Sequence, residues 1–566
     1  MPDRKWQIAV IVALGMLSFL PSLWGGFVFD DRLLMVHPVI LNGSLKQVLT
    51  SGLLDILGTN CGGYWRPVGL VSIWLENKIF GLRPFFFKLD NILIHILTSI
   101  LIFFLLLKFL KLINFNSENA QKVSFFAVAL FSVHTTHTEA IAMVSGRYDL
   151  FATMFVIVSF YFFIRWISTD KLSRAIVWLF VSIALYLVAS MSKESAVPLP
   201  LAIMALAIFP KLPRRKIFWG VMAFFLVFWI IYMPLRWSFS FGAIQLLRYG
   251  DKLQGAIFNL PHTFSRYLQL AVFPFYPNPV YSIDIFSIAF DFRTIVSWII
   301  SLPILIIAAI TLLKRRFEGY AIAWFIVFLL PVLGILNTAG AFIADRYIYI
   351  ASIGFTGAIS SFWVIKYFKR KTGRFLLWGY IGAMLVSSFL YTQFVWTGQD
   401  KLARFMMLRS PRRSIGYIMA SIEEIRRNNP QKTLEYIARY KNKNGIGGKE
   451  FCNTAAIAHS MLGQTDSVVF YYKHAIRLDP TDYKLQNNLG YIFFQNGELD
   501  SALVHFKWSA QINSEYPFAL KNLTDIWLEM GDTIKAGRFF SMLENVAGQD
   551  TKFDYYIEEK KAIFGK

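Results

Sequence analysis

The sequence predicts an all-α protein with two parts, a membrane bundle of about eleven helices followed by a soluble array of paired helices. Three observations support this fold class. The 566-residue chain is 56% apolar and only 16% charged, whereas soluble domains carry about 25% charged residues. The long apolar segments are confined to residues 1–396, and residues 450–566 repeat with a regular period. A purely soluble chain and a disordered chain are both excluded.

Charge separates the two parts. Residues 397–566 contain 23 Lys+Arg and 19 Asp+Glu, an ordinary soluble composition, so most of the net charge of +22 belongs to residues 1–396. We expect a membrane domain over 1–396, linker helices with a weak first repeat over 397–449, and a repeat domain over 450–566. Two cysteines, Cys61 and Cys452, are too few for a disulfide framework or a closed zinc site.

A helix that crosses the bilayer needs about 20 mainly apolar residues. Segments close to this requirement are 7–26, 87–107, 122–137, 150–166, 175–191, 195–210, 217–235, 293–313, 319–337, 347–365 and 375–395. The first segment has a basic start but leads into Trp24-Gly25-Gly26 instead of a small-residue cleavage site. We therefore expect it to be retained as a signal anchor.

Basic residues predict the orientation, because Lys and Arg are enriched in cytoplasmic loops. They cluster before the first segment and then in every second loop, around residues 4–5, 108–122, 165–174, 211–216, 314–316 and 366–374. This alternation places the amino terminus in the cytoplasm. With eleven spans, residues 397–566 are expected outside it.

The carboxyl-terminal part repeats every 34 residues, and the recurring positions are Gly463, Gly497, Gly531, Tyr472, Phe506 and Phe540. A 34-residue period with small residues at the helix crossing and an aromatic residue on the second helix is the tetratricopeptide pattern. Asn429 occupies the glycine register of a weaker unit that starts near residue 414. Such arrays bind peptides or partner domains on one face.

Polar residues gather at the predicted outer ends of the spans. Ionisable side chains at membrane depth are costly and usually pair or serve a site. Six segments carry them: Asp30-Asp31, Tyr64–Pro67, His134 with His137 and Glu139, Arg147 with Asp149, Lys193-Glu194, and Asp345-Arg346. Because both signs meet at one membrane face, we expect a common pocket. Interfacial anchoring remains the alternative for any single residue.

The chemistry of such a pocket fits sugar transfer from a lipid phosphate. A carboxylate takes or orients the proton of an acceptor hydroxyl, a role expected of Asp30 or Asp31. Cationic side chains hold the phosphate leaving group and neutralise its developing charge. The candidates for that second role are Arg66, Arg147, Lys193 and Arg346.

A divalent metal is the one cofactor left open. His37, His134, His137 and Glu139 are candidate ligands, but no short HxxxH or HExxH signature is present. His134 and His137 are three residues apart, which is weak evidence by itself.

Further motifs complete the series, namely Asn91 with His95, His-Thr-Glu-Ala at 137–140, Gly-Arg-Tyr-Asp at 146–149, Ser-Lys-Glu at 192–194 and Asp-Arg-Tyr-Ile-Tyr at 345–349. Their order, with the trailing repeats, resembles the transmembrane and tetratricopeptide-repeat-containing (TMTC) O-mannosyltransferases and their bacterial relatives across nearly the whole chain. That family belongs to the type C glycosyltransferases (GT-C), multispan enzymes that use polyprenyl-phosphate sugars on the lumenal or periplasmic face.

The resemblance implies a GT-C bundle in which one carboxylate of Asp30-Asp31 is catalytic. It also implies that the donor and acceptor site is lined by Glu139, Arg147, Lys193 and Glu194, and we expect the same pocket to include His137, Asp149 and Asp345. The chain departs from the family at Thr135, where proline is usual, and at Asp345-Arg346, where Glu-Arg is usual. These departures leave the sugar and the acceptor open.

Three functions are compatible with these features. The first is transfer of one sugar, mannose or another hexose, from a dolichyl- or undecaprenyl-type phosphate to Ser/Thr of proteins that the repeats recruit. The second is transfer of a whole lipid-linked glycan or modification of a glycolipid, and the third is a non-enzymatic scaffold. We expect the lipid bilayer as a partner and no nucleic acid. The short array favours a prokaryotic inner or plasma membrane.

Overall fold

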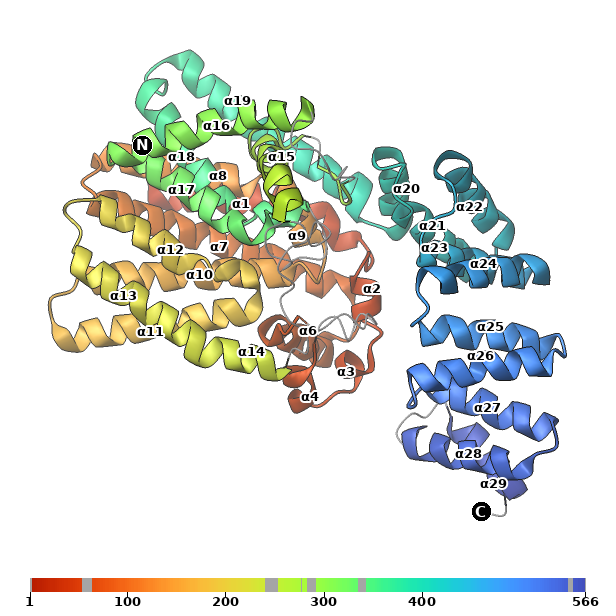
Figure 1. Cartoon of the computed structure of the whole chain (residues 1–566). Coiled ribbons are helices and arrows are strands. Elements are labelled where there is room, and N and C mark those ends of the chain that lie inside the picture. Colours follow the sequence, from red (N-terminus) through yellow and green to blue (C-terminus); the bar gives the residue numbers. More distant parts are fainter. Residues whose placement is uncertain are drawn as a thin grey trace. The chain divides into compact units, whose positions relative to one another are not determined.

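The computed structural model describes residues 3–52, 64–239, 253–275, 277–281, 292–333, 343–547 and 553–564. Over this part of the chain the secondary structure is helical, and no strand occurs (Figure 1). The chain forms two compact units, Met1–Leu402 and Ala403–Lys566. The predicted all-α fold class is confirmed, whereas the three-part division at residues 397 and 450 stays a prediction.

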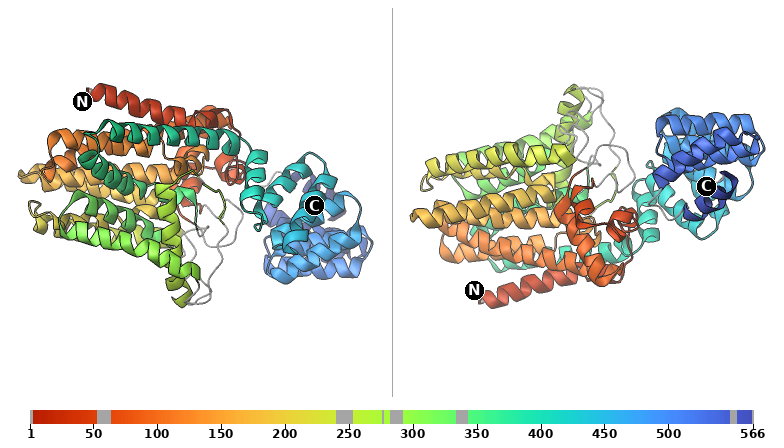
Figure 2. Two further views of the ribbon diagram at one scale, coloured as in Figure 1. Left: turned by 90° about the horizontal axis from the view of Figure 1, so that it is seen from above. Right: turned by 90° about the horizontal axis from the view of Figure 1, so that it is seen from below.

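In the described residues, seven helices of the first unit are long and apolar enough to cross a membrane. They are Arg4–Trp24 (α1 and η1), Pro84–Leu112 (α7), Arg147–Ile167 (α10), Leu172–Ser192 (α11), Arg214–Ser238 (α13 to α14), Phe292–Leu313 (α16) and Lys371–Trp396 (α19 and η8). These helices run side by side in both views of Figure 2.

The other four predicted spans contain shorter helices. Two are the apolar stretches Glu194–Ile208 and Phe317–Val332, and two are α8 (Ser117–Ser132) and α18 (Ser352–Lys366). Most of α8 is buried, because it packs between α7 and α18 inside the unit. A helix enclosed by others can be apolar on all sides without the length of a span. Residues 334–337 of the predicted span 319–337 lie outside the described residues.

The longest of the helices that were not predicted from the sequence is α15 (Leu253–Val272). It packs against α16 and has Pro261 inside it. Its buried face includes the polar residues Asn259 and Thr263. These polar residues and the proline interrupt the apolar run that a hydropathy search requires.

Four short helices follow the first long helix in the described residues: α2 (Asp31–Leu34), α3 (Pro38–Leu41), α4 (Leu45–Thr50) and α6 (Pro67–Phe80). They share a small core with Phe87 of α7 and Tyr148 of α10. A Cβ at Gly69 would lie 2.2 Å from the Tyr148 ring, so glycine is required where α6 approaches α10. This layer is thereby anchored to two long helices at the end of the bundle that carries the polar motifs.

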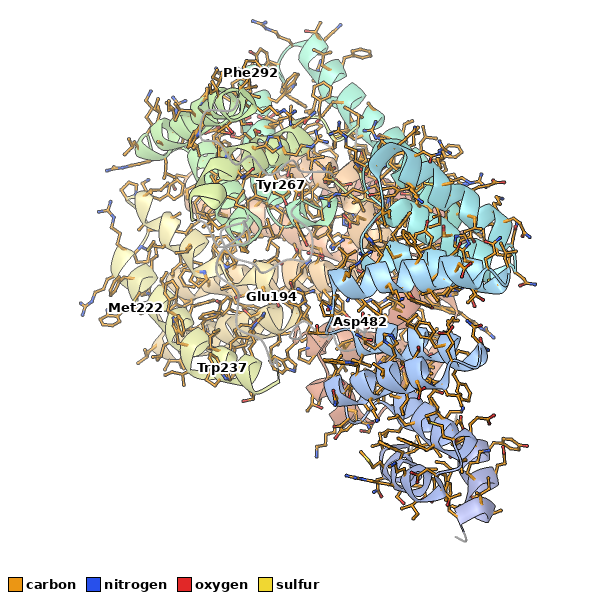
Figure 3. All side chains as sticks on the ribbon, turned by 45° about the vertical axis from the view of Figure 1, so that its right-hand side comes forward. Glu194, Met222, Trp237, Tyr267, Phe292 and Asp482 are labelled. Atoms are coloured by element: carbon orange, nitrogen blue, oxygen red, sulfur yellow. The ribbon has the colours of Figure 1, made fainter. Side chains whose placement is uncertain are left out.

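Large apolar side chains remain exposed on the first unit, as expected of a surface that faces lipid. Trp237 and Phe292 are 78% and 76% exposed, whereas Glu194 is buried (Figure 3). The charged motifs are therefore inside the unit and its margin is apolar, the reverse of a water-soluble bundle.

The second unit is an array of helix pairs, α21/α22 (Ile415–Arg426, Pro430–Asn444), α23/α24 (Lys449–Met461, Thr465–Leu478), α25/α26 (Tyr483–Gln495, Leu499–Ile512) and α27/α28 (Pro517–Glu529, Thr533–Ala547), preceded by α20 (Gln399–Arg409) and followed by α29 (Asp554–Phe564). Gly463, Gly497 and Gly531 adopt positive φ angles of 68°, 77° and 80° in the turns within the pairs. The recurring aromatic residues Tyr472, Phe506 and Phe540 are buried in the core of the array.

The register predicted for the first pair was wrong by one residue. Asn428, with φ of 56°, takes the left-handed position, whereas Asn429 caps α22 by accepting a 3.3 Å hydrogen bond from the Lys432 amide. Asparagine tolerates the left-handed conformation because its short amide bonds locally. Of the two cysteines, Cys61 lies outside the described residues and Cys452 is a buried free thiol.

Candidate active site

The first loop enters the site through a strained turn. Phe29 has a positive φ of 54°, which is costly for a bulky residue, and its amide donates a 2.9 Å hydrogen bond to Gln399. Strained backbone of this kind clusters at functional sites. The turn sets the direction of the next two residues, Asp30 and Asp31.

Asp31 is fully buried and ties the first loop to the loop before α10. Its two carboxylate oxygens accept 2.9 Å hydrogen bonds from the amides of Val144 and Ser145. Gly146 permits this tight turn, because a Cβ there would lie 2.1 Å from the Ala140 carbonyl oxygen. Burial raises the pKa of Asp31, and the amide hydrogen bonds oppose the shift. Its environment is that of a structural carboxylate.

Asp30 is partly exposed, and no hydrogen bond reaches its carboxylate from any residue that the structure describes. Burial raises the pKa of Asp30 to about 6; the Arg346 cation opposes this shift, whereas Asp31 and Glu139 add to it. Asp30 is therefore mostly ionised at neutral pH and lies within electrostatic reach of Arg346 and Glu139.

Arg346 and Glu139 form a buried ion pair beside Asp30. The Arg346 guanidinium and Glu139 are in direct contact, and the Arg346 amide donates a 3.0 Å hydrogen bond to the second carboxylate oxygen. The Arg346 side chain keeps 18% of its surface exposed, against 1% for Glu139. Its free surface leaves room for a further anionic partner.

Lys193 pairs with Asp149 at distances of 2.7 and 2.6 Å to the two carboxylate oxygens. Its ammonium lies 5.1 Å from the centre of the Tyr347 ring, and the Arg346 guanidinium lies 5.2 Å from the same centre. One aromatic ring thus brings two candidate phosphate ligands together. Burial lowers the pKa of Lys193 to about 8, an effect that Asp149 opposes and the cations Arg66 and Arg346 reinforce.

Glu194 bridges two arginines. Its oxygens accept hydrogen bonds of 2.6 Å from Arg66 and 2.7 Å from Arg236, and all three residues are at most 9% exposed. Arg66 also lies 4.4 Å from the centre of the Tyr64 ring. Two Arg66 nitrogens donate to one Glu194 oxygen and Arg236 donates to the other, so both guanidinium groups are held in place by charge-assisted hydrogen bonds.

Arg147 bonds to a different set of residues from Lys193, Arg346, Arg66 and Arg236. It is 1% exposed and forms an ion pair with Glu76 of α6. Its other nitrogens donate to Asn91, at 2.9 Å, and to the Phe87 carbonyl, at 2.8 Å. All three nitrogens are thus hydrogen-bonded to the protein, so the structure differs here from the expectation of a phosphate ligand. Arg147 connects α6, α7 and α10 beneath the site.

His137 and Asp345 also face other partners. His137 is fully buried and belongs to a ring cluster, with centroids 5.1 Å from His134 and 4.5 Å from Tyr349. Asp345 accepts hydrogen bonds from the Tyr281 hydroxyl and, at 3.0 Å, from the Asn278 amide. His137 is thus held in an aromatic cluster, whereas Asp345 is bonded by Tyr281 and Asn278 and lies within electrostatic reach of Glu139.

In the described ranges no group of three or more His, Cys, Asp or Glu side chains is arranged to hold a metal ion. His37, one of the candidate ligands, instead caps α3 by accepting a 3.3 Å hydrogen bond from the Val39 amide.

Sequence reasoning missed Arg236, Gln399 and Glu76. Arg236 lies one residue beyond the predicted span 217–235, so the search for charges at outer span ends could have found it. Glu76 and Gln399 carry no such signal, because their partners Arg147 and Phe29 are far away in the sequence.

The two units define the class: a multi-pass membrane protein with a buried cluster of acidic and basic side chains and a tetratricopeptide-repeat domain. The tetratricopeptide-repeat family model matches residues 471–504. A crystal structure of MamA is similar at 14% identity, with a TM-score of 0.25, and covers 27% of this chain and 89% of that chain.

Curated relatives are named protein O-mannosyl-transferases, several of them with TMTC names. A protein O-mannosyl-transferase of Caenorhabditis elegans, F38B6.6, is 33% identical over 153 residues, covering 26% of this chain and 21% of the relative. Human protein O-mannosyl-transferase TMTC3 is 28% identical over 200 residues, covering 34% of this chain and 20% of the relative. The chain is a relative of the TMTC proteins, as the motifs predicted, and the matches span about a fifth of these relatives' own length.

Proposed function

We propose that the chain is a membrane glycosyltransferase that moves one hexose, in the first instance mannose, from a polyprenyl-phosphate donor to Ser or Thr hydroxyls of proteins outside the cytoplasm. The main support is the Asp30 carboxylate. It has no hydrogen-bond partner in the described part of the chain and lies within electrostatic reach of Arg346. The names of the relatives support the reaction class.

Asp30 acts on the acceptor in this mechanism. The acceptor oxygen attacks the anomeric carbon, a new carbon–oxygen bond forms, and the bond between that carbon and the phosphate oxygen breaks. The hydroxyl proton passes to the Asp30 carboxylate, and the electron pair leaves with the polyprenyl phosphate. A carboxylate whose pKa is raised to about 6 is a better base than an ordinary aspartate and is still mostly ionised at pH 7.

Lys193 and Arg346 hold the phosphate, supported by Arg66 and Arg236. The first two cations meet at the Tyr347 ring, and each is oriented by an acidic partner, Asp149 or Glu139. Fixed cations that need no reorganisation stabilise charge as it develops on a leaving group. The repeats of the second unit recruit the acceptor protein, as helical arrays bind extended segments on one face.

Mass spectrometry of extracytoplasmic proteins from cells with and without the gene tests the proposal. Loss of a single hexose from Ser or Thr is the expected result, and loss of a whole oligosaccharide would favour transfer of a lipid-linked glycan. In parallel, the purified chain and a polyprenyl-phosphate hexose should glycosylate a Ser/Thr peptide. No transfer by the folded wild-type chain with any such donor would contradict the proposal.

A further inference from the structure

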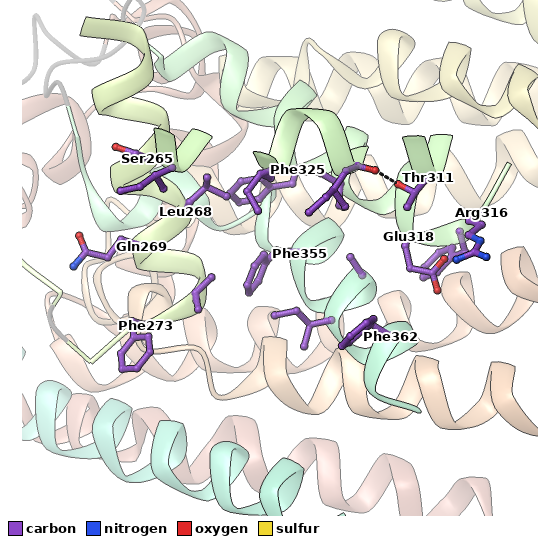
Figure 4. Close-up of a pocket in the computed structure, with 18 of the residues that line it drawn as sticks. Ser265, Leu268, Gln269, Phe273, Thr311, Arg316, Glu318, Phe325, Phe355 and Phe362 are labelled. Atoms are coloured by element: carbon purple, nitrogen blue, oxygen red, sulfur yellow. Dashed lines mark hydrogen bonds between the residues drawn. The ribbon is translucent and has the colours of Figure 1, made fainter. Parts of the chain in front are cut away.

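The first unit contains an apolar cavity of about 1740 Å³ between α15, α16, α17 (Phe317–Leu329) and α18 (Figure 4). Pockets for small molecules enclose roughly 300–1,000 Å³, so this cavity is larger than such ligands need. Between its ends it is lined by Leu268, Phe325 and Phe355 (Figure 4). A surface of this size and composition is suited to long hydrocarbon chains.

Polar side chains occur at the two ends of the cavity. Figure 4 shows Ser265 and Gln269 towards one end, and Arg316 and Glu318 at the other. The apolar side chains lie between them. This pattern is that of an amphipathic ligand, with its chains in the middle and its polar group at one end.

The Arg316 end carries an excess of positive charge. Arg315, Arg316 and Lys366 line the cavity, are exposed, and form no ion pair with any residue within the described ranges. Glu318 stands among them, but its carboxylate accepts a 2.6 Å hydrogen bond from Ser361. Three cations against one acid favour an anionic group at this end.

We propose that this cavity binds an anionic glycerophospholipid, with its acyl chains between α15, α16, α17 and α18 and its phosphate at Arg315, Arg316 and Lys366. Basic pockets between membrane helices are suited to anionic lipid headgroups. The site is distinct from the proposed sugar-transfer site, because Asp30, Lys193 and Arg346 do not line the cavity.

The competing occupant is the hydrocarbon tail of the sugar donor. Two further cations, Arg266 and Arg293, line the cavity, but both already have partners in the protein. Arg266 donates a hydrogen bond to Gln269 and lies 5.0 Å from the ring centre of Tyr281, whose hydroxyl bonds Asp345. A donor in its reacting position would place its phosphate near Lys193 and would leave the three cations at the far end without a partner. The charge distribution therefore favours a lipid whose headgroup lies at Arg316.

Lipid binding to the full chain tests the proposal. The purified protein in mild detergent is titrated with phosphatidylglycerol or phosphatidylcholine of identical acyl chains, and bound lipid is counted by native mass spectrometry. Each Lys or Arg beside an anionic lipid strengthens binding by about fivefold. Phosphatidylglycerol should therefore bind at least about tenfold more tightly than phosphatidylcholine.

The triple variant Arg315→Gln, Arg316→Gln, Lys366→Gln should lose this preference and leave phosphatidylcholine binding unchanged. The matched control replaces three exposed basic residues that do not line the cavity, Lys171→Gln, Arg174→Gln and Arg215→Gln, and should keep the preference. Filling the cavity with Ala358→Phe should weaken both lipids. If thermal unfolding shows that this variant is destabilised, Ile300→Trp, at a half-exposed lining position, replaces it.

Equal affinity for the two lipids would overturn the proposal, as would an equal loss in the control variant. The same titration with a polyprenyl phosphate separates the competing occupant. If filling the cavity abolishes polyprenyl-phosphate binding while the triple variant binds phosphatidylglycerol normally, the cavity belongs to the donor tail and the proposal is wrong.

Discussion

Asp30 and Asp31 are adjacent in the sequence but have different surroundings. Asp31 accepts two backbone hydrogen bonds and is fully buried, whereas the partly exposed Asp30 lies within electrostatic reach of Arg346. We expect Asp30→Asn to lower the rate of sugar transfer by about 10²–10⁴-fold, the usual contribution of a general base. Rates are measured with saturating donor and a Ser/Thr peptide.

Asp31→Asn is the matched comparison. Asparagine offers one acceptor oxygen where Asp31 offers two, so one of the hydrogen bonds from the Val144 and Ser145 amides is lost. A hydrogen bond to a charged group contributes about 1.5–3 kcal/mol to stability. Its thermal unfolding midpoint should fall, whereas that of Asp30→Asn should not, because the neutral amide relieves the desolvation of an ionised Asp30. Full activity of Asp30→Asn would place the base elsewhere.

The pH dependence of the transfer rate should follow the ionisation of the Asp30 carboxylate. Since the ionised form of Asp30 accepts the proton and its pKa is raised to about 6, the rate should rise as the pH increases from 5 to 7. Arg346 lowers the pKa of Asp30 and Glu139 raises it, so Arg346→Gln should move the rising limb to higher pH and Glu139→Gln to lower pH. Limbs that stay in place in both variants would show that another group controls the rate.

At the scale of elements, the ion pair between Glu76 and Arg147 fastens α6 to α10. Removing one partner of a buried pair leaves an unpaired charge and costs about 3–5 kcal/mol. Glu76→Ala and Arg147→Ala should therefore both lower the unfolding midpoint in detergent. Lys193→Ala and Arg346→Ala also leave a buried carboxylate unpaired and should lower the unfolding midpoint, but they should in addition reduce transfer by about 10²–10³-fold in the protein that remains folded. If Arg147→Ala proved stable but inactive, Arg147 would be a ligand of the donor phosphate and not a structural residue.

At the scale of the whole molecule, the alternation of basic loops predicts that residues 397–566 lie outside the cytoplasm. A membrane-impermeant thiol reagent applied to intact cells or spheroplasts should label Asn442→Cys, at an exposed position of α22. Lys171→Cys, at a predicted cytoplasmic loop, should react only after lysis, and the wild-type chain measures the background from Cys61 and Cys452. The opposite pattern would reverse the topology.

The repeat unit should be separable from sugar transfer. A chain truncated after Ser410 keeps α20, whose Gln399 holds the Phe29 turn. We expect it to bind the donor and to modify a short peptide at saturating concentration as the full chain does. Transfer to folded protein acceptors should fall by about 10²-fold, because a linked binding module raises the local concentration of its ligand by that order. If the truncated chain folds but no longer binds the donor, the repeats must contribute to the sugar-binding site, and the prediction is wrong.

Much of the fold could be predicted because it depends on local sequence. Apolar runs and a 34-residue period recur along the chain itself, and the helices of both units follow them. α15 escaped prediction because Pro261 and buried polar residues break its apolar run, and the register of Asn428 escaped because turn conformation is finer than periodicity.

Partnerships among charged residues needed the tertiary structure. From the sequence, Arg147 and Arg346 were equivalent cations at span ends; folding directs Arg147 to Glu76, 71 positions away, and Arg346 to Glu139, 207 positions away. Likewise, the backbone turn at Phe29 decides that Asp31 meets the amides of Val144 and Ser145 while Asp30 stays without such a partner. Sequence alone sufficed for most of the long helices, because hydrophobic burial acts through local composition, and it supplied most of the charged candidates. Their separate environments were decided by three-dimensional proximity, because Coulomb interactions and hydrogen bonds depend on distances between segments that the linear chain does not contain.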